Sequence, residues 1–203
     1  MTPPLQPKEP TDMRLLALAS EHLRLLGARR LTVVAIAEAA GMTHANVYRY
    51  FPSKEALVDA VVDAWIKSVE TRLTDIADGP DPSDDKLERM ILALARANRD
   101  GLSDNPALYA AFREAMTKRR AVARRHRVRV RTLLDRVIDE GVNSGAFEPR
   151  DKERAAVFVL DACFRFIHPV AVEMEADVPQ TQFDQRLGNV VKVVLRALGS
   201  GAI

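Results

Sequence analysis

The chain of 203 residues is long enough to bury one full hydrophobic core and to carry a small additional module. Its composition, 47% hydrophobic and 29% charged, is that of a soluble globular protein and excludes an intrinsically disordered one. A formal net charge of +2 is too small to indicate a polyanionic partner by itself, so the positions of the charges matter more than their sum.

The compartment follows from the cysteine count and from the start of the chain. Cys163 is the single cysteine, which excludes an internal disulfide framework and favours a reducing environment. Residues 1–11 carry several prolines and no apolar run, so we expect an extended, flexible arm rather than a signal peptide. No stretch of 18 or more uncharged apolar residues occurs. We therefore expect a cytoplasmic protein with no membrane partner.

Helical periodicity begins directly after the arm. Residues 12–26 repeat leucine and alanine at steps of three and four, which predicts a first helix ended by Gly27. A short helix is predicted over residues 33–40, with Thr32 as its N-cap and Gly41 as its stop.

Two further helices follow closely. Thr43 can cap another short helix over residues 44–50. Ser53 can cap a long fourth helix, whose apolar stripe runs through residues 54–73 and ends before the acidic, proline-bearing loop at residues 79–82.

The rest of the chain also reads as helical, without the alternating pattern of strands. Further helices are predicted over residues 84–102, 106–116, 117–140, 151–173 and 181–198, with Gly141 closing the third of these. We therefore predict an all-α fold of about nine helices.

Residues 33–50 have the pattern of a helix-turn-helix, in which a tight, glycine-containing turn joins two short helices. The second helix presents polar side chains at its front. Asn46 can pair with adenine, His44 can donate to guanine or to phosphate, and Ala45 can pack against a thymine methyl group. We interpret this front as a reader of the DNA major groove. The alternative is an ordinary pair of short helices in a bundle.

Neighbouring side chains suit phosphate oxygens, which position a protein without specifying sequence. This group consists of Thr43, Tyr48, Tyr50 and Lys54. The hydroxyl and free amides at the Thr32 helix start can hold another phosphate.

Read in order, this region gives Thr32, Ile36-Ala37, Ala40-Gly41, Thr43, Tyr48-x-Tyr50-Phe51 and Ser53-Lys54-Glu55-x-Leu57. That order resembles the N-terminal signature of the TetR family of bacterial repressors. The resemblance implies a helix-turn-helix DNA-binding domain over residues 12–57 and a ligand-binding and dimerisation domain over residues 58–203. His44 and Asn46 depart from the residues usual at their positions, and Met42 replaces the more usual valine, so the operator sequence stays open.

A strongly basic run occupies residues 118–131. It contains Lys118, Arg119, Arg120, Arg124, Arg125, Arg127, Arg129 and Arg131, with no acidic residue among them. Helical spacing spreads these charges around the circumference, so we favour a solvated or loop-pairing surface over a nucleic-acid contact. The available counter-charges are Asp75, Asp78, Asp81, Asp84 and Asp85.

The predicted helix over residues 151–173 is apolar on more than one face, which indicates burial on two sides. Together with the last helix, whose apolar residues are Val190, Val191, Val193, Val194, Leu195 and Leu198, it is expected to pack against its copy in a homodimer. The TetR resemblance implies the same contact.

Two sets of residues are candidates for a ligand pocket. Asp161, Arg165 and His168 interrupt the apolar helix on one face, where a polar handle for a small ligand and a local salt bridge are equally compatible with the spacing. An apolar cavity between the central helices can be lined by bulky side chains, although core packing is their commoner fate. These are Trp65, Met90, Tyr109, Phe112, Met116 and Phe164.

The sequence favours no enzyme. The four histidines are scattered, Glu-x-x-His pairs are lacking, and we see no phosphate-binding glycine loop, so we expect neither a metal nor a cofactor. We predict a ligand-responsive transcription regulator that binds a palindromic operator in double-stranded DNA as a homodimer and is released by a small-molecule effector of unknown identity. Repression rather than activation rests on the resemblance alone. The alternatives are a helical small-molecule-binding module or an enzyme without DNA binding, and salt-dependent binding to a duplex separates them.

Overall fold

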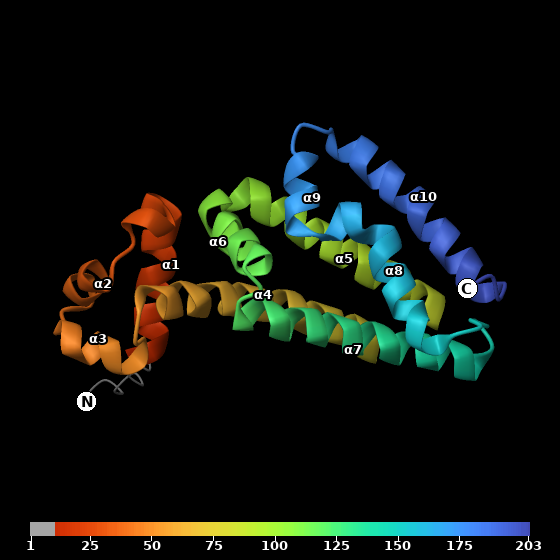
Figure 1. Ribbon diagram of the computed structural model, residues 1–203, viewed down its shortest axis with the longest axis horizontal. Helices are drawn as coiled ribbons and strands as arrows, with labels where there is room; N and C mark the ends of the chain where they lie inside the picture. The colour runs from red at the N-terminus through yellow and green to blue at the C-terminus, as the bar shows by residue number, and fades with distance from the viewer. Residues whose placement is uncertain (1–10) are drawn as a thin grey trace, which may run out of the picture.

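The computed structural model describes residues 11–203, in which the regular structure is entirely helical (Figure 1). The predicted all-α class is confirmed. In chain order the helices are α1 (Thr11–Arg30), α2 (Val33–Ala40), α3 (His44–Tyr50), α4 (Lys54–Asp78), α5 (Ser83–Asp104), α6 (Pro106–Thr117), α7 (Ala121–Ser144), α8 (Lys152–Ile167), α9 (Pro169–Met174) and α10 (Gln180–Gly199). The predicted arm lies outside the described residues except for Thr11.

Helix α4 runs through most of the molecule and joins its two ends (Figure 1). Its 25 residues span about 37 Å at 1.5 Å per residue. Helices α1, α2 and α3 form a small head at its N-terminal end, and α7 lies alongside it. Helices α5, α8 and α10 build up the other end of the molecule.

The buried hydrophobic residues form two clusters that meet within α4. One cluster joins α1, α2, α3 and the first half of α4 to α6 and the start of α7, and it includes Ile66. The other joins the second half of α4, from Val69 onward, to α5, α7, α8 and α10. Trp65 packs against both. Helix α6 therefore shares a core with the head, and the domain boundary after residue 57 stays a prediction.

The predicted helix ends around the turn are confirmed in detail. The hydroxyls of Thr32, Thr43 and Ser53 accept backbone N–H groups of their own helices, at 3.1, 3.4 and 3.0 Å. Gly41 ends α2 with a φ of 64°, a left-handed conformation that glycine adopts without steric cost. Thus each short helix begins and ends through local chemistry that the sequence displays.

Three other predicted ends were wrong. Gly27 (φ 74°) kinks α1, and helical structure resumes through Arg30. Residues 118–120 connect α6 to α7, so α7 begins at Ala121 rather than near residue 117. Gly141 lies inside α7, where Phe147 occupies the space that a side chain would need, and Gly145 (φ 77°) ends the helix instead.

The helix predicted over residues 151–173 is divided at His168 into α8 and α9. His168 has extended backbone dihedrals, and Pro169 is the first residue of α9, where its missing N–H is not needed. Lys152–Met174 is long and apolar enough, by length and composition, to cross a membrane, although Asp161 and Arg165 interrupt it. In this fold the buried side chains of its α8 part belong to the second core cluster.

The basic run pairs mainly with α4 and its own neighbourhood, not with the acidic loop. Helix α7 runs parallel to α4, so its first turns lie beside the start of α4, and the loop lies beside its later turns. The loop-pairing prediction was wrong for this reason. The ion pairs of the run are Arg120–Asp59, Arg125–Asp63, Arg131–Asp135 and Lys118–Glu114, whereas Asp78 near the loop binds Arg136, beyond the run.

Candidate nucleic-acid interface and ligand cleft

The helix-turn-helix is held by a small apolar core. Ile36, Ala37 and Val47 are fully buried, and their small or branched side chains let α2 and α3 cross closely. The guanidinium of Arg14 on α1 donates to the carbonyl of Ala40 at 2.9 Å, which satisfies a group left free at the end of α2. These contacts fix the orientation of α3 relative to the head.

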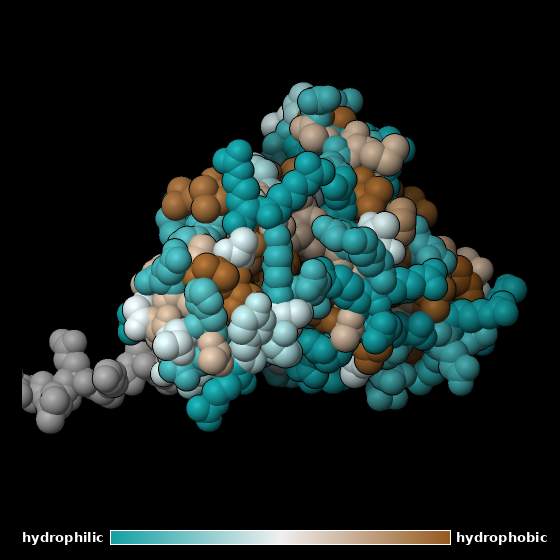
Figure 2. Space-filling view, turned by 60° about the vertical axis from the view of Figure 1, so that its left-hand side comes forward, coloured by the Kyte–Doolittle hydropathy of each residue, from teal (hydrophilic) through white to brown (hydrophobic). Residues whose placement is uncertain are grey.

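The predicted reading front is exposed as a unit. His44, Ala45 and Asn46 lie on the first turn of α3 and all face solvent. Tyr48 and Tyr50 are 49% and 46% exposed, which is unusual for large aromatic side chains in a free chain and leaves both hydroxyls accessible. In Figure 2, where this end of the molecule is turned forward, the surface is mostly hydrophilic with separate hydrophobic patches.

Three predicted phosphate contacts have additional structural roles. Thr32 and Thr43 use their hydroxyl oxygens as acceptors in helix caps, so each hydroxyl can still donate its proton to a phosphate, beside the free N–H groups nearby. The ammonium of Lys54 donates to the carbonyl of Arg29 at 2.8 Å. An ammonium has three donors, so this bond leaves two for a phosphate.

Sequence reasoning missed further cations near this front. Arg49 is exposed on α3, and Arg29 and Arg30 are exposed at the end of α1, where Lys54 is also bound. Their signal was present as basic residues in the last turns of two helices. The head therefore carries more positive charge than the signature residues alone indicate.

A cleft of about 350 Å³ opens between α4, α5 and the start of α6. Trp65 and Tyr109, both predicted pocket residues, contribute to its wall. Gly101 lies between the two rings, and a Cβ there would approach Trp65 Cζ2 to 3.1 Å and Tyr109 Cδ2 to 3.2 Å. Arg72, Asp100 and Asp104 bring charge to the cleft wall.

The structure does not bring the other predicted pocket residues to this cleft. Met90 and Phe112 are buried in the two cores, and Met116 packs against the head cluster. Phe164 is 50% exposed and stacks on His168, with ring centroids 4.4 Å apart. The role of these residues in ligand binding stays a prediction.

The polar candidates on α8 and at its C-cap also lie outside the cleft wall. Asp161 faces solvent, and Arg165 binds Glu175. Burial lowers the pKa of His168, and the nearby cation of Arg127 lowers it further, so the imidazole is neutral at physiological pH. Arg165 thus forms a salt bridge with a residue outside this set, and the interpretation of the set as a ligand handle stays a prediction.

A buried polar network connects the cleft wall to the break between α8 and α9. The Tyr109 hydroxyl lies 3.1 Å from Asn98 Oδ1 and 3.2 Å from the Pro169 carbonyl, and the Asn98 amide donates to the carbonyls of Leu94 and Ile167. Burial raises the pKa of Tyr109, so its hydroxyl stays protonated. The network satisfies backbone groups that the helix break exposes.

Within residues 11–203 no group of three or more histidine, cysteine, aspartate or glutamate side chains is arranged to hold a metal ion. What the described chain does have is an exposed helix-turn-helix front at one end and an open cleft beside the helix that carries it. This is the organisation of a helical DNA-binding regulator with a sensor domain.

Comparison with known proteins specifies the class. Residues 15–61 match the bacterial regulatory proteins of the tetR family, and residues 83–191 match the tetracyclin repressor-like C-terminal domain. The chain belongs to the tetR family of bacterial regulatory proteins.

Individual relatives are distant. The chain is 32% identical over 80 residues to the nucleoid occlusion factor SlmA of Photobacterium profundum, a match that spans 39% of this chain and 40% of SlmA. A TetR/AcrR-family transcriptional regulator from Thermobifida fusca YX-ER1 is similar in structure, with a TM-score of 0.65, 20% identity, and coverage of 91% of this chain and 96% of that one. A protein with unknown function from Rhodococcus sp. RHA1 gives a TM-score of 0.72 at 18% identity, covering 98% and 100%. These similarities show the shared fold.

Proposed function

We propose that the protein is a cytoplasmic homodimeric repressor that binds a palindromic operator and is released by a small molecule. The observation that carries this proposal is the exposed front of α3, where His44, Ala45 and Asn46 project from a helix whose buried Val47 and capping Thr43 fix its orientation. Two-fold symmetry would place one such helix in each of two successive major grooves, about 34–36 Å apart.

In this proposal the exposed residues of the head have two roles, base reading and phosphate binding. His44, Ala45 and Asn46 choose the base sequence, since their side chains match base-edge chemistry. A second group holds phosphates and sets the register: Thr32, Thr43, Tyr48, Tyr50 and Lys54.

An exposed apolar strip on α8 and α10 supports the dimer. Val157 and Phe164 on α8 are 41% and 50% exposed, and Val193 on α10 is 62% exposed. Val191 and Val194, by contrast, are used in the core of the chain itself. The face available to a second copy is therefore narrower than the sequence pattern indicated.

The effector is proposed to bind in the cleft beside Trp65 and Tyr109. Because Trp65 belongs to α4 and α4 carries the head, a ligand that prefers one position of α4 shifts the population of head positions. Packed helices change between discrete arrangements, so a small displacement at the cleft can alter the separation of the two heads.

A direct test begins with duplexes that the wild-type protein selects from a random-sequence pool. We expect Tyr48→Ala and Lys54→Ala to weaken binding to all selected duplexes, because a lost phosphate contact carries no sequence information. Asn46→Ala should instead relax selectivity at one base pair, by about 1–3 kcal/mol. Lys67→Ala is the matched control, since Lys67 is an exposed lysine in the middle of α4 and pairs with Asp63.

Two results would count against the proposal. If the wild-type protein bound no duplex even at low salt, a helical module or an enzyme without DNA binding would be the better interpretation. If Tyr48→Ala and Lys54→Ala bound as tightly as Lys67→Ala does, the assignment of the phosphate contacts would be wrong.

A further inference from the structure

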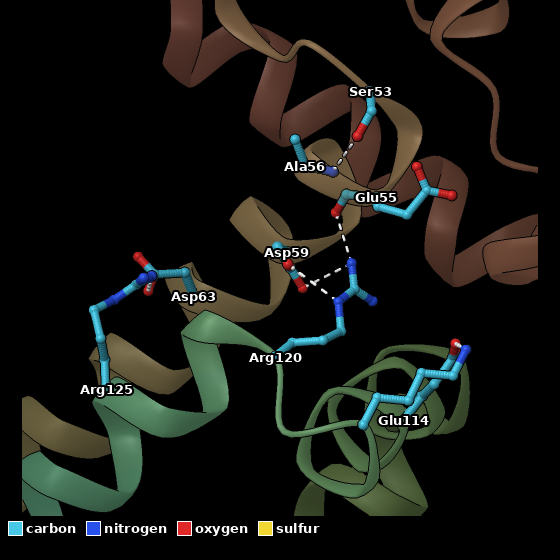
Figure 3. A network of polar contacts seen from close by, with 9 residues as sticks. Ser53, Glu55, Ala56, Asp59, Asp63, Glu114, Arg120 and Arg125 are labelled. Carbon is cyan, nitrogen blue, oxygen red and sulfur yellow. Dashed lines mark hydrogen bonds and ion pairs between the residues drawn. The ribbon is translucent and has the colours of Figure 1, made fainter.

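One arginine reaches from the ligand-binding part of the chain to the base of the head. The Arg120 guanidinium, just before α7, donates from Nη2 to the Glu55 carbonyl at 2.9 Å and from Nε to Asp59 Oδ2 at 3.1 Å (Figure 3). Its Nη2 also lies 3.0 Å from Asp59 Oδ1, as an electrostatic contact. Both acceptors belong to the first two turns of α4.

The turn between α6 and α7 holds Arg120 in place. Arg119 has a φ of 50°, a left-handed conformation that is uncommon for a residue with a side chain. The N–H of Arg120 donates to the carbonyl of Ala115 at 2.9 Å, which closes the end of α6. The Arg120 side chain therefore starts from a fixed point at the end of α6.

The next arginine contact of the basic run with α4 is of a different kind. Arg125 binds Asp63 at 3.1 Å, but its side chain is 65% exposed, and solvent weakens such pairs. The side chains of Arg120 and Asp59 are only 18% and 28% exposed. A planar guanidinium that holds a carboxylate and a main-chain carbonyl together also fixes direction, which a single surface pair does not.

The segment that Arg120 holds is the one that carries the head. Ser53 caps it, Lys54 binds the end of α1, and Leu57 is fully buried in the head core. An angular change at this point is transmitted to α3 as a rigid displacement.

We propose that Arg120 is a positioning residue for DNA reading: it fixes the angle of the head relative to α6 and α7, and so the separation of the two reading helices in the dimer. This inference rests on the proposed function, because a separation has meaning only for two heads on one operator. Arg120 itself touches no DNA in this proposal.

The spacing between half-sites tests it. Starting from a duplex selected by the wild-type protein, one base pair is added to or removed from the centre, which moves a half-site by about 3.4 Å and rotates it about the helix axis. The wild-type protein should bind the altered duplexes much more weakly. Arg120→Ala removes this polar contact but leaves the apolar core between the head and α6, so the head gains limited angular freedom. This penalty should therefore shrink by about threefold to tenfold, which lies within the range expected for coupling between contacting groups.

Arg125→Ala is the matched control and should keep the full spacing penalty, because its pair lies further along α4 and is exposed. Arg120→Lys and Asp59→Asn provide variants if Arg120→Ala does not fold, and both should reduce the penalty. The inference would be overturned if every folded Arg120 and Asp59 variant showed the same spacing penalty as Arg125→Ala. A wild-type protein that shows no spacing dependence would instead contradict the proposed dimeric reading.

Discussion

Cys163 is enclosed on α8, and its environment decides its chemistry. The residue is fully buried in the second core cluster, and burial raises the pKa of its thiol to about 12. The thiolate is the reactive form, so almost none is present near neutral pH. The structure therefore gives Cys163 the role of a small core residue and not that of a redox sensor.

We expect a thiol reagent to modify Cys163 in the native protein at pH 8 only on the timescale of unfolding. The same reagent should react at once in denaturant. The measurement is the absorbance of the coloured thiolate that the reagent releases when it reacts with Cys163, with and without guanidinium. Rapid stoichiometric modification of the native protein would show that the α8 packing opens locally.

Glu175 gathers two arginines at the end of α9. Its carboxylate binds Arg186 at 2.7 Å and also Arg165, while its side chain is only 6% exposed. Burial alone would raise its pKa, but the hydrogen bonds from Arg186 and Arg165 outweigh burial, and the net pKa lies below the usual value. A carboxyl whose pKa is lower in the folded state stabilises that state above its unfolded pKa of about 4.3.

The stabilisation by Glu175 should therefore disappear as pH falls from about 5 through the lowered pKa. We expect Glu175→Gln to reduce the free energy of unfolding by about 1–2 kcal/mol at pH 7, a value limited by the exposure of Arg165. The difference from wild type should shrink toward zero below about pH 4. Urea unfolding across this pH range measures it, with exposed Glu148→Gln as the control. An equal difference at every pH would mean that the ionised carboxylate is not the stabilising species.

At the scale of helices, ends set by local chemistry were predictable, and ends set by packing were not. The caps of α2, α3 and α4 lie where their hydroxyl residues indicated, because each bond spans three residues. Helix α7 instead continues through Gly141, against which Phe147 packs from beyond the helix, and ends at Gly145. Such a contact has no signature in the sequence around the glycine.

Gly141 is thus required by packing rather than by its backbone conformation. A Cβ at this position would lie 2.1 Å from Phe147 Cδ2, and Phe147 is buried. We expect Gly141→Ala to destabilise the protein by about 1–3 kcal/mol, despite the higher helix propensity of alanine. Chemical denaturation measures this change.

A second substitution tests the cause of that destabilisation. Gly141→Ala combined with Phe147→Leu should cost less than the sum of the two single changes, because the smaller side chain makes room for the methyl group. Additive effects would indicate that the two residues do not compete for space.

The two parts of the candidate site also differ in how far the sequence predicts them, because one is local in sequence and the other is formed by packing. The reading front follows from one continuous segment, so its residues could be named from the sequence. The cleft joins Trp65 of α4 to Gly101 of α5 and Tyr109 of α6, and its charged residues Arg72 and Asp100 were not found. Their proximity depends on how three helices pack, which periodicity does not specify.

At the scale of the molecule, α4 and α6 connect the proposed ligand cleft to the proposed DNA-reading head. The cleft touches both helices, and the head core includes the first half of α4 and all the buried residues of α6. A ligand bound in the cleft, as proposed above, would therefore contact the same packed unit that holds α3. Helices α8 and α10 bury their other residues in the second core cluster, so the proposed dimer contact on their exposed residues is separate from this unit.

This separation makes the dimer testable without altering the head. Val193 on α10 and Leu25 on α1 are both 62% exposed, so a charge is tolerated at either position in a single chain. If α10 packs against its copy, Val193→Glu buries an unpaired carboxylate in the contact and should produce monomers, whereas Leu25→Glu should leave the dimer intact. Analytical ultracentrifugation at equal protein concentrations distinguishes the two outcomes.

Binding to DNA should follow the oligomeric state. Two linked heads gain about 10²- to 10⁴-fold in affinity over one head, because the second contact is intramolecular. The monomeric Val193→Glu variant should lose most of this gain on a palindromic duplex, yet bind an isolated half-site as the wild-type protein does. A Val193→Glu protein that remained dimeric would move the interface away from α10. A monomer that kept full affinity for the palindrome would show that one head suffices for recognition.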